Sequence, residues 1–397
     1  MQTKKQQRPV GLILLIFVAF IALGMPDGLL GVGWPSIRTG FGIPLDSLGL
    51  LLFTAMVGYL TSSFISGELT RRWGVGKLLI ISCVLTGTGL ISYTLVQEWW
   101  MMVALGVVTG LGAGAIDSGL NAYVASHFGP GLMQWLHASY GIGVTTGPLI
   151  MTFALANFQN WRLGYLVVGG FQLVLAISFW ISLPIWKNHA GSEAQTPETS
   201  SPKGPSLGTT LKQPRVWWSL ALFFLYTGSE VTLGTWVYTL LTEGRGIDPE
   251  LAGVFAGSYW ATFTVGRILA GVVARKVRIQ SLVKGCILLA LFGAVMLWWN
   301  PVTWVSLAAV ALIGLAIAPM FPGLVTGTAG RVGQEHANNA IGIQTAAAGL
   351  GGTALTSLVG VLARAYNLEF IPLALVGFLV CLFGVFLVNE RNGVKAW

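Results

Sequence analysis

Charged side chains are scarce in this chain: Asp, Glu, Lys and Arg make up 9% of its 397 residues, whereas soluble domains carry about 25%. Hydrophobic residues make up 54%, and the mean hydropathy is +0.74. This composition excludes an ordinary soluble domain. It favours a protein that crosses a membrane several times.

Cysteine and histidine are scarce as well. The three cysteines lie in apolar stretches without CxxC or Cys/His spacing, which excludes a disulfide framework and a zinc site. The sequence holds neither a glycine-rich phosphate loop nor a recognisable Ser/His/Asp set. We therefore expect no enzyme activity, no direct use of ATP, no metal and no cofactor.

Basic residues outnumber acidic ones and give a net charge of +8. They are scattered in short segments between apolar runs and form no stripe, which argues against nucleic-acid binding. In the predicted topology seventeen of them fall on the side of the termini, four on the opposite side, and Arg267 lies inside a span. By the positive-inside bias, this asymmetry predicts a multi-pass protein of the inner (plasma) membrane with both termini in the cytoplasm.

Hydropathy divides the chain into twelve predicted transmembrane helices. One connection, 187–214, is rich in Pro, Ser, Thr, Gly and charge, and we interpret it as a flexible cytoplasmic linker. The chain then consists of an N-terminal six-helix bundle (1–186), the linker and a C-terminal six-helix bundle (215–397). The predicted spans are 9–35, 45–68, 77–97, 99–126, 133–157, 162–186, 215–242, 250–274, 280–299, 303–328, 337–363 and 369–389.

An internal repeat supports this division. Residues in the first half recur in the second at an offset near 204: Gly110 corresponds to Gly314, and Asp27 corresponds, at an offset of 203, to Glu230. Two similar bundles in parallel orientation enclose a site at the membrane midplane that is reachable alternately from either side.

The segment Gly67-Glu-Leu-Thr-Arg-Arg-Trp-Gly-Val-Gly-Lys77 resembles the cytoplasmic loop signature of the major facilitator superfamily. Thr70 stands where that signature commonly has Asp, and Glu68 is the nearest carboxylate. A second copy lies at Gly266 to Lys276. The resemblance covers the whole chain and implies an all-α fold of twelve transmembrane helices in two pseudo-symmetric bundles.

A narrower resemblance is to the fucose/glucose/galactose:proton symporter family. It rests on Asp27, on GAGAIDSGLNAYV with Asp117 and Asn121, and on LHASYGIGVTTGPL, which begins just before His137. In that family, acids on the first and fourth helices are implicated in proton coupling and substrate binding. The fourth-helix acid is commonly Glu and the fifth-helix polar residue commonly Asn, so Asp117 and His137 depart from the pattern.

The physical chemistry of these residues also favours a role in proton coupling. A carboxylate at membrane depth is costly, so Asp27 is expected to face a cavity and to exchange protons there. Asp117 and Asn121 are four residues apart and share a helical face. His137 is expected within reach of Asp117, so that Asp27, Asp117 and His137 are the candidates for proton coupling.

Other polar and aromatic residues are candidates for binding the solute or for gating. Asn121, Glu230 and Gln344 supply hydrogen-bonding groups, and Trp34 and Trp236 supply aromatic faces on which a sugar ring could stack. The predicted gating residues at the cytoplasmic side are Arg71, Arg72, Arg267 and Arg275.

These observations predict a monomeric secondary active transporter, energised by the proton gradient, that carries a small polar solute, expected to be a monosaccharide, with protons. One alternative is a proton-driven efflux antiporter for an amphipathic compound, since the same acids and many aromatics suit a drug cavity. A second alternative is a membrane sensor or a lipid-modifying enzyme.

Overall fold

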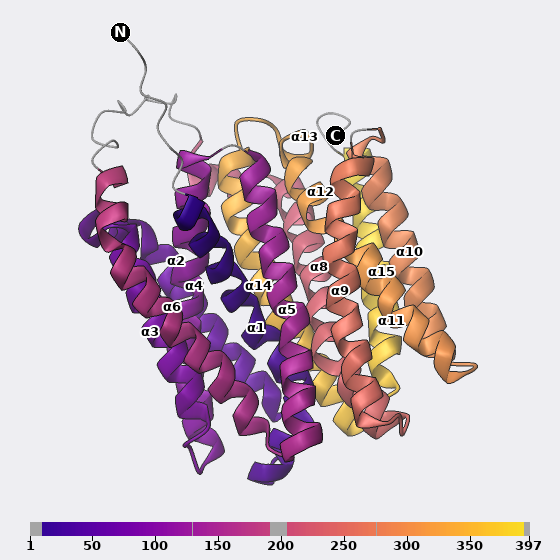
Figure 1. The fold of residues 1–397 in the computed structure, drawn as a ribbon. Helices are drawn as coiled ribbons and strands as arrows, with labels where there is room; N and C mark the ends of the chain where they lie inside the picture. Colours follow the sequence, from indigo (N-terminus) through magenta and orange to yellow (C-terminus); the bar gives the residue numbers. More distant parts are fainter. Residues whose placement is uncertain (1–9, 129, 191–204, 275, 393–397) are drawn as a thin grey trace.

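The computed structural model describes residues 10–128, 130–190, 205–274 and 276–392. In these ranges the chain is helical, without strands, and the long helices run side by side as parallel and antiparallel rods (Figure 1). Eleven segments of the described residues are long and apolar enough to cross a membrane. With α9 (Pro249–Val273) beside them, they make the twelve crossings expected from hydropathy.

The first six crossings form the N-terminal bundle, in which α2 packs on α4, α1 on α5, and α3 on α4 and α6. Its helices are α1 (Val10–Phe41), α2 (Leu48–Trp73, preceded by the short η1, Leu45–Ser47), α3 (Val75–Tyr93), α4 (Trp99–His127), α5 (Pro130–Phe158) and α6 (Trp161–Ala190).

The other six crossings form the C-terminal bundle, in which α8 packs on α14 and α15, and α11 on α9 and α10. A short helix, α7 (Leu207–Leu211), precedes this bundle, and linker residues 191–204 lie outside the described residues. The bundle comprises α8 (Pro214–Thr239, continued by η3, Leu240–Gly244), α9 (Pro249–Val273), α10 (Ile279–Trp299), α11 (Thr303–Ile317), α12 (Met320–Thr326), α13 (Thr328–Val332), α14 (Ala337–Ala365) and α15 (Phe370–Asn392).

The predicted spans differ from the helices by up to six residues at their ends, and the predicted linker 187–214 contains the end of α6 and all of α7. The first helix passes Pro35 and ends at Phe41, six residues beyond the predicted end. The predicted tenth span is not one continuous helix, because it is interrupted between α11 and α12 at Ala318 and Pro319. Proline has no backbone N–H to donate to the preceding turn, which favours a break at this position.

Each bundle contains an equivalent close contact between two of its own helices. A Cβ atom on Gly110 of α4 would overlap the carbonyl oxygen of Ala55 on α2. Gly314 of α11 meets the carbonyl oxygen of Tyr259 on α9 in the same way. Both members of the second pair lie 204 positions after those of the first, so the repeat seen in the sequence recurs as the same helix crossing.

The bundles meet along α5 and α9 on one side and along α2 and α14 on the other, with α1 against α8 between them. Figure 1 shows α1, α5, α14 and α8 in the middle of the molecule. We call the end where α1 begins and α15 ends the terminal face, and the end where α1 finishes the distal face. The interface between the bundles thus runs through the centre of the membrane domain.

Candidate functional site

Asp27 lies on α1 near the middle of the helix stack. Glycines 24 and 28 let α1 approach the backbone of α5 closely, and the Tyr140 hydroxyl of α5 donates a hydrogen bond of 2.6 Å to Asp27 Oδ2. The Asp27 side chain is exposed at the surface of the helices although many protein atoms surround it. Because α1 packs against helices of both bundles, this carboxylate lies where the two bundles meet.

Asp117 is the second carboxylate of the N-terminal bundle. The Asn121 amide, one helical turn further along α4, donates a hydrogen bond of 2.8 Å to Asp117 Oδ1, and the Tyr59 hydroxyl of α2 donates to Oδ2. Asp117 is close enough to Asp27 for the two charges to interact. The N-terminal bundle therefore presents two interacting carboxylates, each held by a tyrosine from another helix.

Glu230 on α8 is the carboxylate of the C-terminal bundle. The Tyr226 hydroxyl donates to its side chain, and the Tyr259 hydroxyl of α9 donates a hydrogen bond of 2.9 Å to its backbone oxygen. One turn after each acid, Gly31 and Gly234 allow α1 and α8 to cross: a Cβ on Gly31 would lie 2.8 Å from the Gly234 carbonyl oxygen. The repeat-related acids Asp27 and Glu230 thus flank the crossing of the two bundles.

Tyr140 connects the acids of the two bundles. Its hydroxyl binds Asp27 and also interacts electrostatically with Glu230 and Arg267. The tyrosine partners of the acids were not predicted from the sequence. The spacing of four between Tyr226 and Glu230 could have revealed one of them, but Tyr59 and Tyr140 reach their acids from other helices.

His137 on α5 does not form the expected pair with Asp117. Asp117 accepts its hydrogen bonds from Tyr59 and Asn121, while the His137 ring packs edge-on against Phe20 with ring centroids 5.9 Å apart. The charge that His137 meets is that of Arg267 on α9. His137 therefore lies at the junction of α1, α5 and α9.

Three of the predicted solute-binding residues are enclosed in packed regions. Trp34 and Trp236 are fully buried, and their indole N–H groups donate to the backbone oxygens of Leu45 and Thr356 at 3.1 and 3.0 Å. Gln344 is also buried, and its amide donates to the Ser219 hydroxyl at 2.8 Å. In this conformation none of the three offers a surface to a solute.

The predicted gating residues are placed differently from one another. Arg71 and Arg72 are exposed at the terminal face and both bind Glu68, which supplies the carboxylate for this loop in place of Thr70. Arg267 lies on α9 beside the acids: its guanidinium sits 4.4 Å from the centre of the Phe263 ring and interacts with the charge of Glu230. Arg275 lies outside the described residues.

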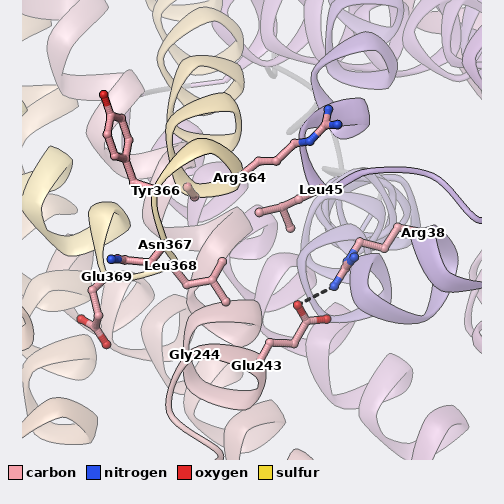
Figure 2. Close-up of a pocket in the computed structure, with 10 residues that line it drawn as sticks. Arg38, Leu45, Glu243, Gly244, Arg364, Tyr366, Asn367, Leu368 and Glu369 are labelled. Atoms are coloured by element: carbon pink, nitrogen blue, oxygen red, sulfur yellow. Dashed lines mark hydrogen bonds and ion pairs between the residues drawn. The ribbon is translucent and has the colours of Figure 1, made fainter.

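The sequence analysis also missed a pair of ionic contacts that join the bundles at the distal face. Arg38 of α1 binds Glu243 of η3 at 2.6 Å, and Arg364 of α14 binds Asp46 of η1 at 2.8 Å. Figure 2 shows the first pair at the edge of a surface hollow of about 440 Å³ lined by both halves of the chain. These contacts close the two bundles against each other at this end.

The arrangement of the chain is that of known transporters. It is similar to a mutant of the nucleoside transporter NupG, with a TM-score of 0.78, 14% identity and coverage of 96% of this chain and 99% of that chain. It is also similar to FucP, a Major Facilitator Superfamily transporter, in the outward conformation, with a TM-score of 0.63, 14% identity and coverage of 95% and 98%.

Sequence comparison agrees with this fold. The chain is 23% identical over 358 residues to a glucose/mannose transporter of Bacillus subtilis (strain 168), covering 88% of this chain and 87% of the relative. The family model of the Major Facilitator Superfamily matches residues 12–356, most of the chain. The protein belongs to the Major Facilitator Superfamily and is a multi-pass membrane transporter, not an enzyme.

Proposed function

We propose that the protein is a proton-coupled symporter that imports a neutral monosaccharide by alternating access. The likeness to a glucose/mannose transporter supports the substrate class. Proton coupling is supported by the exposed carboxylate of Asp27 in the middle of a transmembrane helix, which interacts with the charge of Asp117. We propose that water reaching these two acids delivers the coupling proton.

The coupling follows from the cost of buried charge. Reorientation requires the bundles to close around the central space and to exclude water from it. A bare carboxylate there is penalised in a low-dielectric interior, whereas a protonated one is neutral. The carrier with a proton and a sugar bound therefore reorients readily, while the carrier that holds sugar without a proton is held back.

The membrane orientation follows from the basic residues. We propose that the terminal face, with Arg71 and Arg72, is cytoplasmic and that the protein lies in the plasma membrane as a monomer. The distal face is then extracellular. The Arg38–Glu243 and Arg364–Asp46 pairs at this face support a conformation that is closed toward the outside.

Transport in proteoliposomes tests this function. In Asp27→Asn we expect sugar exchange between equal internal and external pools to continue, whereas accumulation driven by an inward proton gradient falls at least tenfold. Glu98→Gln, an equivalent carboxylate-to-amide change on an exposed residue at the distal face, is the control and should accumulate sugar like the wild type. If Asp27→Asn accumulates sugar as well as the wild type does, the assignment of Asp27 to proton coupling is refuted.

Two further arms of the same assay separate the alternatives. An inward sodium gradient without a proton gradient should drive no accumulation if the proton is the coupling ion. Loading the compound inside and imposing the proton gradient from outside would drive net export in an antiporter. A sensor or an enzyme would show no solute-induced proton uptake at all.

A further inference from the structure

One face of α9 packs against one face of α8 beside the central acids. Tyr259, Phe263 and Arg267 are spaced four residues apart and therefore line one side of α9. Tyr226 and Glu230 do the same on α8. The Tyr259 hydroxyl, bound to the Glu230 backbone oxygen at 2.9 Å, fixes the register between the two faces.

Arg267 and Glu230 carry opposite charges in this interface without closing into an ion pair. Their charges interact, yet no ion pair of 4.0 Å or less joins them. The guanidinium is held over the Phe263 ring, and the carboxylate is held by the Tyr226 hydroxyl. Each group is thus positioned by a neighbour on its own helix, which keeps the two charges apart.

Both groups retain unused hydrogen-bonding capacity. Arg267 Nε is buried and has no hydrogen-bond partner among the residues that the structure describes. The guanidinium carries five N–H donors in a fixed plane, and a carboxylate can accept about four hydrogen bonds, of which the Glu230 side chain uses one, from Tyr226. Arg267 Nε and most acceptor positions of the Glu230 carboxylate are thus unused by the described residues.

We propose that Arg267 and Glu230 form a two-point subsite for neighbouring hydroxyl groups of a neutral sugar, on the C-terminal side of the central space. This subsite rests on the proposed transport function and extends it. A hydroxyl group both donates and accepts, so one hydroxyl can accept from the guanidinium while its neighbour donates to the carboxylate. Charge-assisted hydrogen bonds of this kind are stronger than neutral ones.

The charges around the site favour a neutral ligand over an anion. Three carboxylates belong to this network, because Asp27 interacts with Asp117 and Tyr140 interacts with both Asp27 and Glu230. Within the described ranges, Arg267 is the guanidinium that interacts with Glu230 and Tyr140. An anionic solute would meet more repulsion than attraction. Tyr140 donates a hydrogen bond to Asp27 and interacts with Glu230 and Arg267, so it connects the subsite to the acid proposed to bind the proton.

Equilibrium binding to the purified protein tests the subsite. D-glucose, D-mannose, D-galactose and D-xylose are measured by titration calorimetry, and the tightest binder is then compared with its monodeoxy analogues. In Arg267→Gln and Glu230→Gln we expect affinity for the parent sugar to fall at least tenfold. One deoxy analogue should bind wild type and variants with similar, weak affinity, because it lacks the hydroxyl that hydrogen-bonds to Arg267 or Glu230.

Further variants separate binding from a purely structural role. If the two residues only neutralise each other, the double variant Arg267→Gln/Glu230→Gln restores wild-type affinity; a binding subsite leaves it at least as weak as the single variants. Arg267→Lys keeps the positive charge, and its melting temperature shows whether the protein still folds with another residue at this position. Ser258→Ala on α9, whose hydroxyl bonds its own helix at Phe255, is the control and should bind normally.

The outcomes are distinguishable from failure of the proposed function. If a sugar binds the wild type and both single variants bind it equally well, the subsite is refuted while the transport proposal stands. Tighter binding of D-glucuronate than of D-glucose would also refute it. If no monosaccharide binds the wild type, the sugar-transport proposal and the subsite fall together.

Discussion

The ion pairs at the distal face predict how one substitution shifts the conformational equilibrium. The Arg38–Glu243 contact is short, at 2.6 Å, and its side chains are 26% and 30% exposed, so it is only partly screened by water. Glu243→Gln removes the charge but keeps the shape. Because the two residues belong to different bundles, the loss falls on the state in which the distal face is closed.

The expected size of the shift follows from the burial of the pair. Fully exposed ion pairs contribute about 0–1 kcal/mol, and hydrogen bonds to charged groups contribute roughly 1.5–3 kcal/mol. For this partly buried contact we take about 1–1.5 kcal/mol, which corresponds to a shift of roughly 5- to 13-fold toward distal-open states. The Arg364–Asp46 pair should add less, since the Arg364 side chain is 55% exposed.

Spin-label distances measure this shift. Nitroxides at Gln97→Cys and Val302→Cys, in a background without the three native cysteines, report the separation of the bundles at the distal face, where both residues are exposed. Glu243→Gln should increase the long-distance population, and the charge reversal Arg38→Glu/Glu243→Arg should restore the short one. Glu250→Gln, an exposed acid at the same face, is the control. Identical distributions for Glu243→Gln and wild type would refute a gate at this pair.

Two further predictions concern packing. Gly110→Ala should lower the stability of the detergent-purified protein by about 1–3 kcal/mol, because its Cβ has no room beside the Ala55 carbonyl, whereas Gly67→Ala, which meets no atom within 4 Å, should melt like the wild type. Trp34→Phe should cost about 1–3 kcal/mol by leaving the Leu45 carbonyl without its N–H donor, yet leave sugar affinity unchanged. A loss of affinity without a loss of stability would instead place the Trp34 ring in the binding site.

The sequence by itself determined the class of the protein and its main candidates. Scarce charge and long apolar runs have no stable solution other than membrane-spanning helices, since backbone polar groups must be satisfied internally in lipid. The recurrence of glycines at a constant offset predicted the duplicated bundle, and the cost of charge in the membrane singled out Asp27, Asp117 and Glu230. These inferences need only local composition and spacing.

Tertiary structure decided which residues meet across helices. Tyr140 and Asp27 are 113 positions apart, and Arg38 and Glu243 are 205 apart, so no periodicity within one helix could pair them. Helix rotation decided that Trp34 and Trp236 turn into packed regions while Arg267 turns toward Glu230. Hydropathy fixes which segments enter the membrane, but rotation and crossing depend on side-chain packing between helices, which the one-dimensional pattern does not encode.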